Sequence, residues 1–416
     1  MAVTAAGDAM ASAASRDRPV VIVGAGLAGS LLALALARRG LAATLVGPAL
    51  AGPALVGPAL LGPVLEGPAP VGAGSMGPGA GAGAPGPGGS APLPSGRPGG
   101  PLVATGLAAT SLSYGSLLGR AAARAWQQLE RHHGPLGWRP APLLLHGWPV
   151  PWGLLPVPVQ ALTTAALAFS RVDTVALAAA LPAALAAAGV ERSHEMVEQI
   201  SPAAEGWRLS LASGGELQAA QLVLAAGAAS RSLWPALPGR LRFSWAGVMV
   251  ADAGPVSARP GRSPSAAQGT PPWLRHARRG GIVQPLGWRR PALEARSTQL
   301  EHEEWIVDAG LAPWGERLLL GQISLVGPDL SHRCPPDPAA MEQRLREGLG
   351  ALDPRLAGWG GTYHQVAVPF CSNGQPLVGP AADQRGLWLF TGFSGAFATV
   401  PALAERLAAE LQAALG

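Results

Sequence analysis

Three glycines near the N-terminus have the spacing of a phosphate-binding turn. Residues 20–40 read VVIVGAGLAGSLLALALARRG, with Gly24, Gly26 and Gly29 in the pattern G-x-G-x-x-G after an apolar run. Between a strand and a helix, the first glycine forms the tight turn, the second lets a pyrophosphate approach the backbone, and the third lets the helix pack closely on the strand. Amides at the helix N-terminus would then face the phosphates. The sequence therefore predicts a dinucleotide-binding site.

The same stretch supports a second interpretation, a membrane-spanning helix. Residues 20–37 are largely apolar, and a bilayer requires roughly 20 such residues. Gly24 and Ala28 also have the small-xxx-small spacing of helix pairs in membranes. Extraction behaviour separates the two hypotheses, because only a membrane-anchored protein requires detergent.

The overall composition excludes several classes of protein. The length of 416 residues predicts about two or three domains. The net charge of +5 comes from scattered arginines without any lysine, whereas a nucleic-acid-binding surface requires clustered charge. The two cysteines, Cys334 and Cys371, and the eight histidines have no zinc-like spacing. We therefore expect no nucleic acid and no metal, and the few cysteines suit a reducing compartment such as the cytoplasm.

Three segments are not expected to contribute to a packed core. Residues 1–17 lack the basic start and apolar core of a cleaved signal peptide, which predicts a disordered leader. From Gly47 the chain repeats GPALA, GPALV, GPALL and GPVLE before Gly-, Ala- and Pro-rich sequence, so 48–100 is interpreted as a flexible insertion. Proline, serine, glycine and arginine dominate about 255–296, which is predicted to be a second flexible excursion.

The remaining patterns mix strand-helix units with a β-rich middle. Their order is expected of a nucleotide-binding domain that a second domain interrupts. The sequence therefore predicts a mixed α/β fold. The predicted helices span 120–131, 173–188, 338–352 and 400–415, and the predicted strands span 43–46, 207–211, 222–225, 318–323 and 387–390.

Several further segments carry a resemblance to a known family. Residues 222–230, LVLAAGAAS, form a strand that ends in small residues, and 171–190 with 197–200 read as a helix, a Gly-Val pair and a strand. Near the C-terminus, GQPLVG at 374–379 precedes LWLFTGFSGAFATVP at 387–401. With the glycine turn, these segments resemble the D-amino acid oxidase and glycine oxidase superfamily of FAD-dependent oxidoreductases, and together they favour FAD over NAD.

The resemblance implies both a fold and an activity. It implies a three-layer, Rossmann-like FAD-binding domain, interrupted by an α+β substrate domain with an antiparallel sheet. It also implies a cytoplasmic enzyme that oxidises the C–N bond of an amine or amino acid-like small molecule by hydride transfer to non-covalently bound FAD. The expected FAD-binding domain comprises 18–47, 101–125, 171–235 and 372–416, and the expected substrate domain comprises 126–170 and 236–371.

The resemblance also assigns cofactor contacts to particular positions. The glycine turn and helix start would hold the pyrophosphate, a valine after the Gly-Val pair would touch the adenine, and the C-terminal loop and helix would hold the flavin ring. The expected cofactor-binding residues are Gly24, Ala25, Gly26, Leu27, Ala28, Gly29, Val197, Ala226, Gly227, Gly379, Gly392, Phe393, Ser394, Gly395 and Ala396.

The chain departs from the family pattern at two positions. Gly47 stands at the end of the second strand, where relatives carry an acid that accepts hydrogen bonds from a ribose hydroxyl. Val368 stands where amino-acid-oxidising relatives carry an arginine that binds the substrate carboxylate. An arginine elsewhere in the chain, for example Arg120 or Arg317, would have to take over that role. These departures leave open a flavin-binding protein with lost or altered catalysis.

The sequence assigns no catalytic side chain. Tyr363, His364 and Tyr114 are candidates near the expected substrate face, although packing or hydrogen bonding is the commoner role of such residues. Some relatives use a lysine near the flavin to promote reaction with oxygen, and its absence here favours a dehydrogenase. Cys371 is out of register with the cysteine that links flavin covalently in some sarcosine oxidases, whose place is nearer Val366.

We expect residues 48–100 to be dispensable for cofactor binding. Replacing them by a short Gly/Ser linker should leave flavin content and thermal stability nearly unchanged, because loop-closure entropy depends weakly on length and an unpacked segment contributes few contacts. The absorbance spectrum and melting curve of the purified variant measure both. A large loss of flavin would instead indicate that this segment covers the adenosine half of the cofactor.

Overall fold

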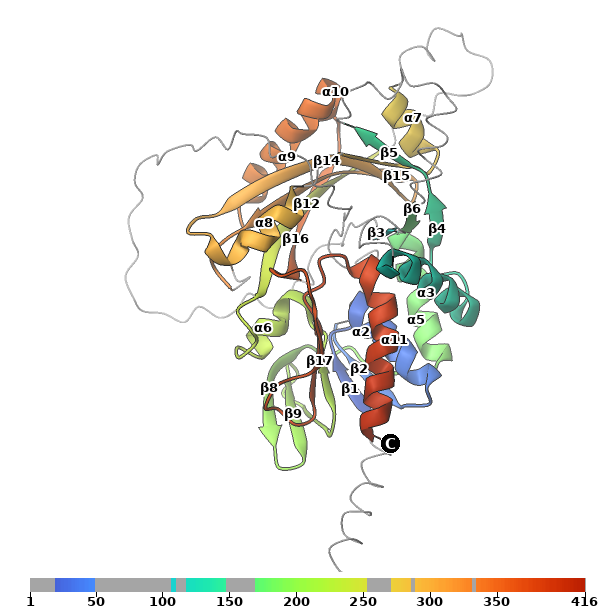
Figure 1. Cartoon of the computed structure of the whole chain (residues 1–416), viewed down its shortest axis with the longest axis vertical. Coiled ribbons are helices and arrows are strands. Elements are labelled where there is room, and N and C mark those ends of the chain that lie inside the picture. The colour runs from blue at the N-terminus through green and yellow to red at the C-terminus, as the bar shows by residue number, and fades with distance from the viewer. Residues whose placement is uncertain are drawn as a thin grey trace, which may run out of the picture.

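The computed structural model describes residues 19–48, 106–109, 117–146, 169–252, 271–285, 289–330 and 334–415. The predicted leader, almost all of the predicted insertion at 48–100, and Tyr114 lie outside these ranges. Two six-stranded sheets form the framework, and each is assembled from segments that are far apart in the sequence. Figure 1 shows the mainly antiparallel sheet above the mainly parallel one.

The first sheet is mainly parallel and has the strand order β17-β18-β11-β1-β2-β7. The central strands β1 and β11 are apolar and buried at every position. Such continuous apolar strands are typical of parallel sheets that are covered on both faces. The strands are β1 (Val20–Val23), β2 (Ala43–Val46), β7 (Glu191–Ser193), β11 (Leu222–Leu224), β18 (Leu387–Thr391) and the antiparallel β17 (Leu377–Pro380).

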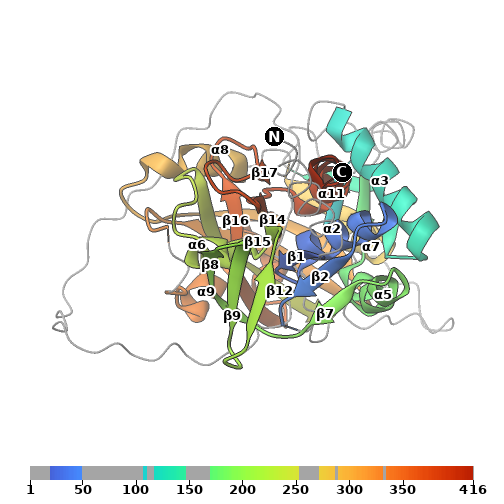
Figure 2. The same ribbon diagram turned by 90° about the horizontal axis from the view of Figure 1, so that it is seen from below.

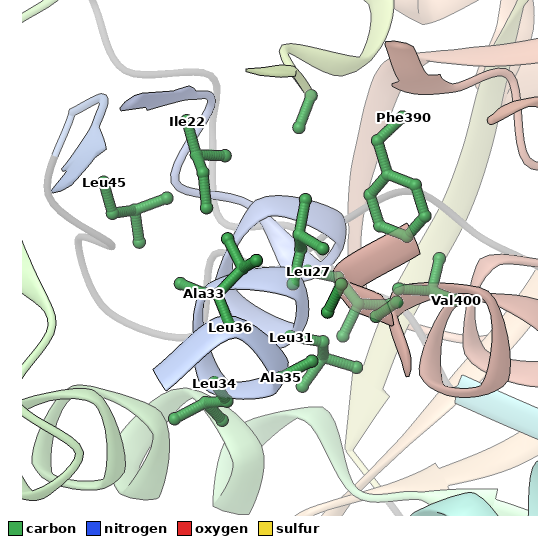
Figure 3. Packing of buried hydrophobic residues seen from close by; sticks show 14 of the residues in the cluster. Ile22, Leu27, Leu31, Ala33, Leu34, Ala35, Leu36, Leu45, Phe390 and Val400 are labelled. Carbon is green, nitrogen blue, oxygen red and sulfur yellow. The ribbon is translucent and has the colours of Figure 1, made fainter. Parts of the chain in front are cut away.

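Helices cover one face of this sheet, and a small antiparallel sheet covers the other. Ile22, Leu27 and Phe390 share the core on the helical face (Figure 3). Val21 packs with Trp207 in the core on the opposite face. These three layers, seen end-on in Figure 2, confirm the predicted Rossmann-like fold. The helices are α2 (Leu27–Arg38), α3 (Leu117–His133), α5 (Thr174–Ala187) and α11 (Ala396–Leu415), and the small sheet contains β8 (Val197–Ala203), β9 (Gly206–Leu211) and β10 (Glu216–Ala219).

The second sheet has the strand order β16-β12-β15-β14-β13-β5, and only β5 runs parallel to its neighbour. Helices α7 and α9 cover one face, here called the outer face, whose core includes Met249, Leu320 and Leu345. The opposite, inner face is turned toward the first sheet (Figure 1). The elements are β5 (Leu143–His146), β12 (Leu241–Asp252), β13 (Ile282–Pro285), β14 (Glu304–Trp314), β15 (Arg317–Val326), β16 (Thr362–Cys371), α7 (Pro272–Arg278) and α9 (Pro338–Leu352).

A third, three-stranded sheet lies between the two large ones, in the order β3-β6-β4. Thr174, just after β6, accepts a hydrogen bond from Trp314 Nε1 of β14 at 3.1 Å, which ties this region to the second sheet. The remaining elements are β3 (Gly106–Ala109), β4 (Trp138–Ala141), β6 (Phe169–Val172), α6 (Ser230–Leu233), α8 (Arg290–Arg296), α10 (Pro354–Ala357) and the 3-10 helices η2 (Gly227–Ala229) and η4 (Ser297–Gln299).

Most predicted elements are confirmed. The predicted helix at 338–352 matches α9, whereas α11 begins at Ala396 rather than at residue 400. The alternative membrane span at 20–37 is divided between β1 and the 12-residue α2. Across the described ranges, no helix is both long enough and apolar enough to cross a bilayer.

Part of the predicted second flexible insertion is instead built into the core. The segment contains α7, β13 and α8, and β13 pairs with both β14 and β5. Ile282 is fully buried and Leu293 is 1 % exposed. The prediction was therefore wrong for 271–285 and 289–296. The apolar runs in these segments are short and are flanked by arginines and prolines, so they do not stand out in the sequence. The predicted domain boundaries themselves stay a prediction.

Ile282→Ala is expected to destabilise the protein by about 2–5 kcal/mol, since the truncation leaves a cavity beneath the second sheet. Arg275→Ala, an exposed substitution on the neighbouring α7, should change the free energy of unfolding by less than about 0.5 kcal/mol. Urea denaturation of both variants measures the difference. Equal stabilities would show that this segment does not pack as described.

Candidate cofactor and substrate site

Three loops meet at one edge of the first sheet. Because β1, β11 and β18 are parallel neighbours, their carboxyl ends lie at the same edge, and such an edge is the usual ligand site of an open α/β sheet. The loops that follow these strands contain residues 24–29, 225–229 and 392–396. All predicted cofactor-binding residues except Val197 and Gly379 belong to them.

The first loop packs so closely that two of its glycines admit no side chain. Gly24 has a φ of +115°, and its amide donates to the Val46 carbonyl at 2.8 Å. A Cβ atom on Gly24 would collide with the carbonyl oxygen of Ala225, and one on Gly29 would collide with the carbonyl oxygen of Gly24. The connection between β1 and α2 therefore has the tight conformation that the glycine spacing predicts.

Helix α2 begins at this edge without a side-chain cap. Gly26 is the N-cap residue, with φ −77° and ψ −168°, and as a glycine it provides no side-chain cap for the amides of the first turn. Such amides have no partner within an α-helix, and with the helix dipole they attract an anion. An uncapped helix start beside bare glycine backbone suits a diphosphate such as that of FAD.

The second loop is tied to the end of β18 by buried hydroxyl groups. Gly227 has a φ of +60° and begins η2. Its carbonyl accepts a hydrogen bond from Thr391 Oγ1 at 3.4 Å, and Ser230 Oγ donates to the same Thr391 oxygen at 3.3 Å. These contacts fix the second loop relative to the third.

The third loop touches the second sheet and contains an unpaired hydroxyl. A Cβ atom on Gly392, where φ is +82°, would come within 2.6 Å of Cys371 Sγ at the end of β16. Phe393 packs edge-to-face on Phe390, with ring centroids 4.9 Å apart. Ser394 Oγ is buried and has no hydrogen-bond partner among the described residues. A bound ligand beside the start of α11 would supply the partner that buried polar atoms normally have.

Two predicted cofactor residues lie outside these loops. Val197, on β8, is buried in the same core as Val46, the last residue of β2. Gly379 pairs with Leu389 on β18, and a side chain added there would come 3.9 Å from Glu410 Oε2 of α11. The structure thus places Val197 in the small antiparallel sheet, whose core packs on the first sheet, and Gly379 about two residues, or about 7 Å, behind the loop edge.

The absence of a ribose-binding acid at Gly47 has a steric explanation. A Cβ atom on Gly47 would come within 2.7 Å of the Ala25 nitrogen and 3.1 Å of its Cβ. The Gly47 amide donates to the Ser193 carbonyl at 3.0 Å. No side chain fits here unless the glycine turn moves, so the missing carboxylate follows from the close packing of β2 against that turn.

Strand β16 separates the candidates Tyr363 and His364. Tyr363 packs against the outer-face core, and its hydroxyl donates to Gln365 Oε1 at 3.2 Å. Burial raises the pKa of the Tyr363 hydroxyl. His364 lies on the inner face opposite Val248, and burial lowers the pKa of its imidazole. Only His364 of this pair is therefore on the side of the cofactor edge.

Val368 also lies on the inner face. It is 5 % exposed and pairs with Ser244, whose Oγ is buried without a partner in the described ranges. Arg317 lies 3.4 Å from Asp252 with its side chain 57 % exposed. Because Asp252 and Ser244 are eight residues apart on β12, Arg317 is about 26 Å from the Val368 position along the strand and does not replace the family arginine. The side chain of Arg120 is outside the described part of the chain.

Sequence reasoning missed three polar residues of the inner face. Ser244, Gln284 and Gln322 are each at most 1 % exposed, and each has a side-chain atom without a described hydrogen-bond partner. Gln284 is the single polar residue of β13, whereas Ser244 and Gln322 lie in largely apolar strands that contain other polar residues, such as Arg242 and Ser324. Such interruptions are a weak signal, because the side of the sheet they occupy becomes known only when the covering helices are placed.

Comparisons with known proteins identify relatives. The profile of a family described as FAD dependent oxidoreductase (DAO) matches residues 19–410. No significant match to a curated protein sequence was found. The structure resembles glycine oxidase from Geobacillus kaustophilus, with 18 % identity and a TM-score of 0.54 over 95 % of this chain and 94 % of that one. It also resembles the fructosyl amine:oxygen oxidoreductase Amadoriase I from Aspergillus fumigatus, with 14 % identity and a TM-score of 0.56 over 97 % and 88 % of the chains. At these low sequence identities, the similarity to both structures shows the fold alone.

Gly26→Val is expected to abolish retention of FAD during purification, because its methyl groups would occupy the space that phosphate oxygens require at the start of α2. Gly360→Val is the matched control, since Gly360 is exposed and a Cβ there meets no atom within 4 Å. The ratio of flavin to protein absorbance measures retention. A full complement of flavin in the Gly26 variant would refute the assignment of this turn.

Proposed function

The chain belongs to the family of FAD-dependent oxidoreductases, and we propose that it oxidises the C–N bond of an amine or amino acid-like small molecule. FAD supplies the hydride acceptor for such a reaction when it is bound. The observation that carries the proposal is the meeting of three glycine-containing loops at one edge, opposite the inner face of the second sheet. This arrangement provides a cofactor side and a substrate side to a single site.

The described residues on the cofactor side and on the substrate side have different roles. The uncapped amides of α2 would hold the diphosphate of FAD, and the third loop, with Ser394, would hold the ring end of the cofactor. Val248, Val250, Trp314 and Leu319 form an apolar cluster on the inner face, which excludes water. These four side chains would orient the substrate. They need supply no redox group, because the cofactor is the hydride acceptor.

We propose that FAD is held without a covalent bond. Cys371 is the cysteine nearest the third loop, and burial raises the pKa of its thiol to about 11. A thiol with this pKa stays protonated at neutral pH, whereas the thiolate is the nucleophile. This supports a protein that binds FAD through non-covalent contacts with the three loops.

We propose that the preferred substrate lacks a free carboxylate. Val368 is apolar and buried where relatives carry an arginine, and Arg317 is paired with Asp252 far along the sheet. A carboxylate buried there without a cation would cost several kcal/mol, roughly the penalty of an unpaired buried charge. Uncharged amines, amides and esters avoid this penalty.

We also propose a cytoplasmic protein whose partner is a small molecule. The exposed Cys334 and the buried Cys371 are both free, which is the usual state of cysteine in a reducing compartment.

A second candidate function is flavin binding without amine oxidation. It is favoured by Gly47 and Val368, since both lack the side chain that relatives use for recognition. The flavin absorbance distinguishes the two functions. Only an oxidoreductase loses this absorbance when its substrate is added in the absence of oxygen.

Anaerobic titration of the flavin-loaded protein tests the proposal. Glycine, sarcosine and D-alanine are compared with their amides, their esters and their decarboxylated amines. We expect the uncharged derivatives to reduce the flavin at least tenfold faster than the free acids, because buried Val368 offers the acids no cation at the position where relatives carry an arginine. Fast reduction by the free acids alone would contradict the substrate class, and no reduction by any compound would favour the second candidate function.

A further inference from the structure

Gln322 lies on the inner face at an irregular point of β15. Leu320 and Ile323 both belong to the outer-face core. A register shift interrupts the pairing of β12 with β15 at this point, so Gly321 and Gln322, the two residues between them, both lie on the inner side. Gln322 Nε2 donates to Ser324 Oγ at 3.1 Å, which is the next residue on that face.

Gln284 comes from β13 and faces the same way. Its neighbour Val283 belongs to the outer-face core and pairs with Leu311 of the antiparallel β14, so Gln284 comes level with Gly310. Gly310 in turn pairs with Gly321 of β15. The two glutamines are therefore two strand spacings apart, about 10 Å, and Gly310, which lies on β14 opposite Gln284, has no side chain.

Both carboxamides are left with unused hydrogen-bonding groups. Gln322 Nε2 donates a hydrogen bond to Ser324 Oγ, and Gln322 Oε1 has no partner in the described ranges. Gln284 is 1 % exposed, and neither its Oε1 nor its Nε2 has a described partner. Buried polar atoms are normally paired, because their removal from water is otherwise uncompensated. The pair thus offers two acceptor oxygens and one donor group to a ligand between them.

We propose that Gln284 and Gln322 recognise a carboxamide group of the substrate. A carboxamide has both kinds of partner, so its carbonyl accepts from Gln284 Nε2 while its N–H groups donate to the two glutamine oxygens. A carboxylate has only acceptors and would place its charge against those oxygens.

This inference rests on the proposed function, in which the inner face holds the substrate, and it narrows the substrate class to an amine that carries a carboxamide. The two glutamines would distinguish a carboxamide from a carboxylate by hydrogen-bond complementarity rather than by charge pairing. A site that offers both donors and acceptors rejects an analogue that leaves one of them unpaired.

Binding of two matched probes tests the inference. Flavin-loaded protein is titrated with propionamide and with propionate, and the change in flavin absorbance is recorded. Neither probe carries an amine, so binding is measured without oxidation. We expect propionamide to bind at least tenfold more tightly than propionate, and Gln284→Leu and Gln322→Leu each to weaken propionamide binding at least tenfold. Gln343→Leu, on the exposed side of α9, is the control and should bind propionamide as the wild type does.

The melting temperature separates recognition from a structural role. Gln284→Leu removes a buried amide that has no described partner and keeps a similar volume, so without probe the variant should melt no lower than the wild type. If Gln284 instead stabilised the fold, its replacement by leucine would lower the melting temperature. Lower melting with unchanged propionamide binding would assign Gln284 a structural role.

Three results would overturn the inference: no propionamide binding, equal binding of propionamide and propionate, or wild-type affinity in both leucine variants. The amine titration described above tests the proposed function separately. Flavin reduction by amines with glutamine-independent propionamide binding would overturn the inference alone. Glutamine-dependent propionamide binding without reduction by any amine would overturn the proposed function alone.

Discussion

Direct backbone contact around Ala25 is the constraint on which the site depends. The turn between β1 and α2 touches the loop after β11 through Gly24 and the end of β2 through Gly47, in both cases without an intervening side chain. Dispersion contacts are strongest at such short separations, and a single added methyl group would force the segments apart. The same contacts leave the start of α2 bare, so close packing and anion binding are two results of one arrangement.

The two sheets contribute different kinds of surface to the site. The first sheet supplies backbone amides and hydroxyl groups at its carboxyl edge, whereas the second supplies apolar side chains interrupted by serine and glutamine. Arg317 pairs with Asp252 in an exposed position at the end of the second sheet. A described buried ion pair, Arg290 with Glu294, lies within the short helix α8. Recognition by neutral groups suits such a face, because unpaired charge is strongly disfavoured in an apolar environment.

The sequence predicted the features that depend on local pattern. The glycine turn, the α9 boundaries and the short apolar strands of the first sheet follow from spacing and periodicity within a few residues of each other. The face of β16 on which Tyr363 and His364 lie did not follow, because it depends on where α9 packs. The burial of Gln284 and the packing of 271–285 and 289–296 were missed for a similar reason: β13 is a short strand, and one of its two partners, β5, comes from a distant part of the chain. The steric need for glycine at position 47 likewise appears only when β2 and the turn are brought together.

The strand order of the first sheet also sets the time at which the cofactor edge can form during synthesis. β1 ends at Val23, whereas its partner β11 begins at Leu222, and β18, which pairs with β11 and completes the edge, spans Leu387–Thr391. Pairing between such distant segments loses chain entropy before it gains contacts, which slows folding. A ribosome releases the glycine turn and β2 long before β11 and β18 exist, so one edge of the apolar strand VVIV stays unpaired until β11 is synthesised. The nascent chain is thus exposed to mispairing and to chaperones until the third loop emerges, and cofactor capture is a late event of its maturation.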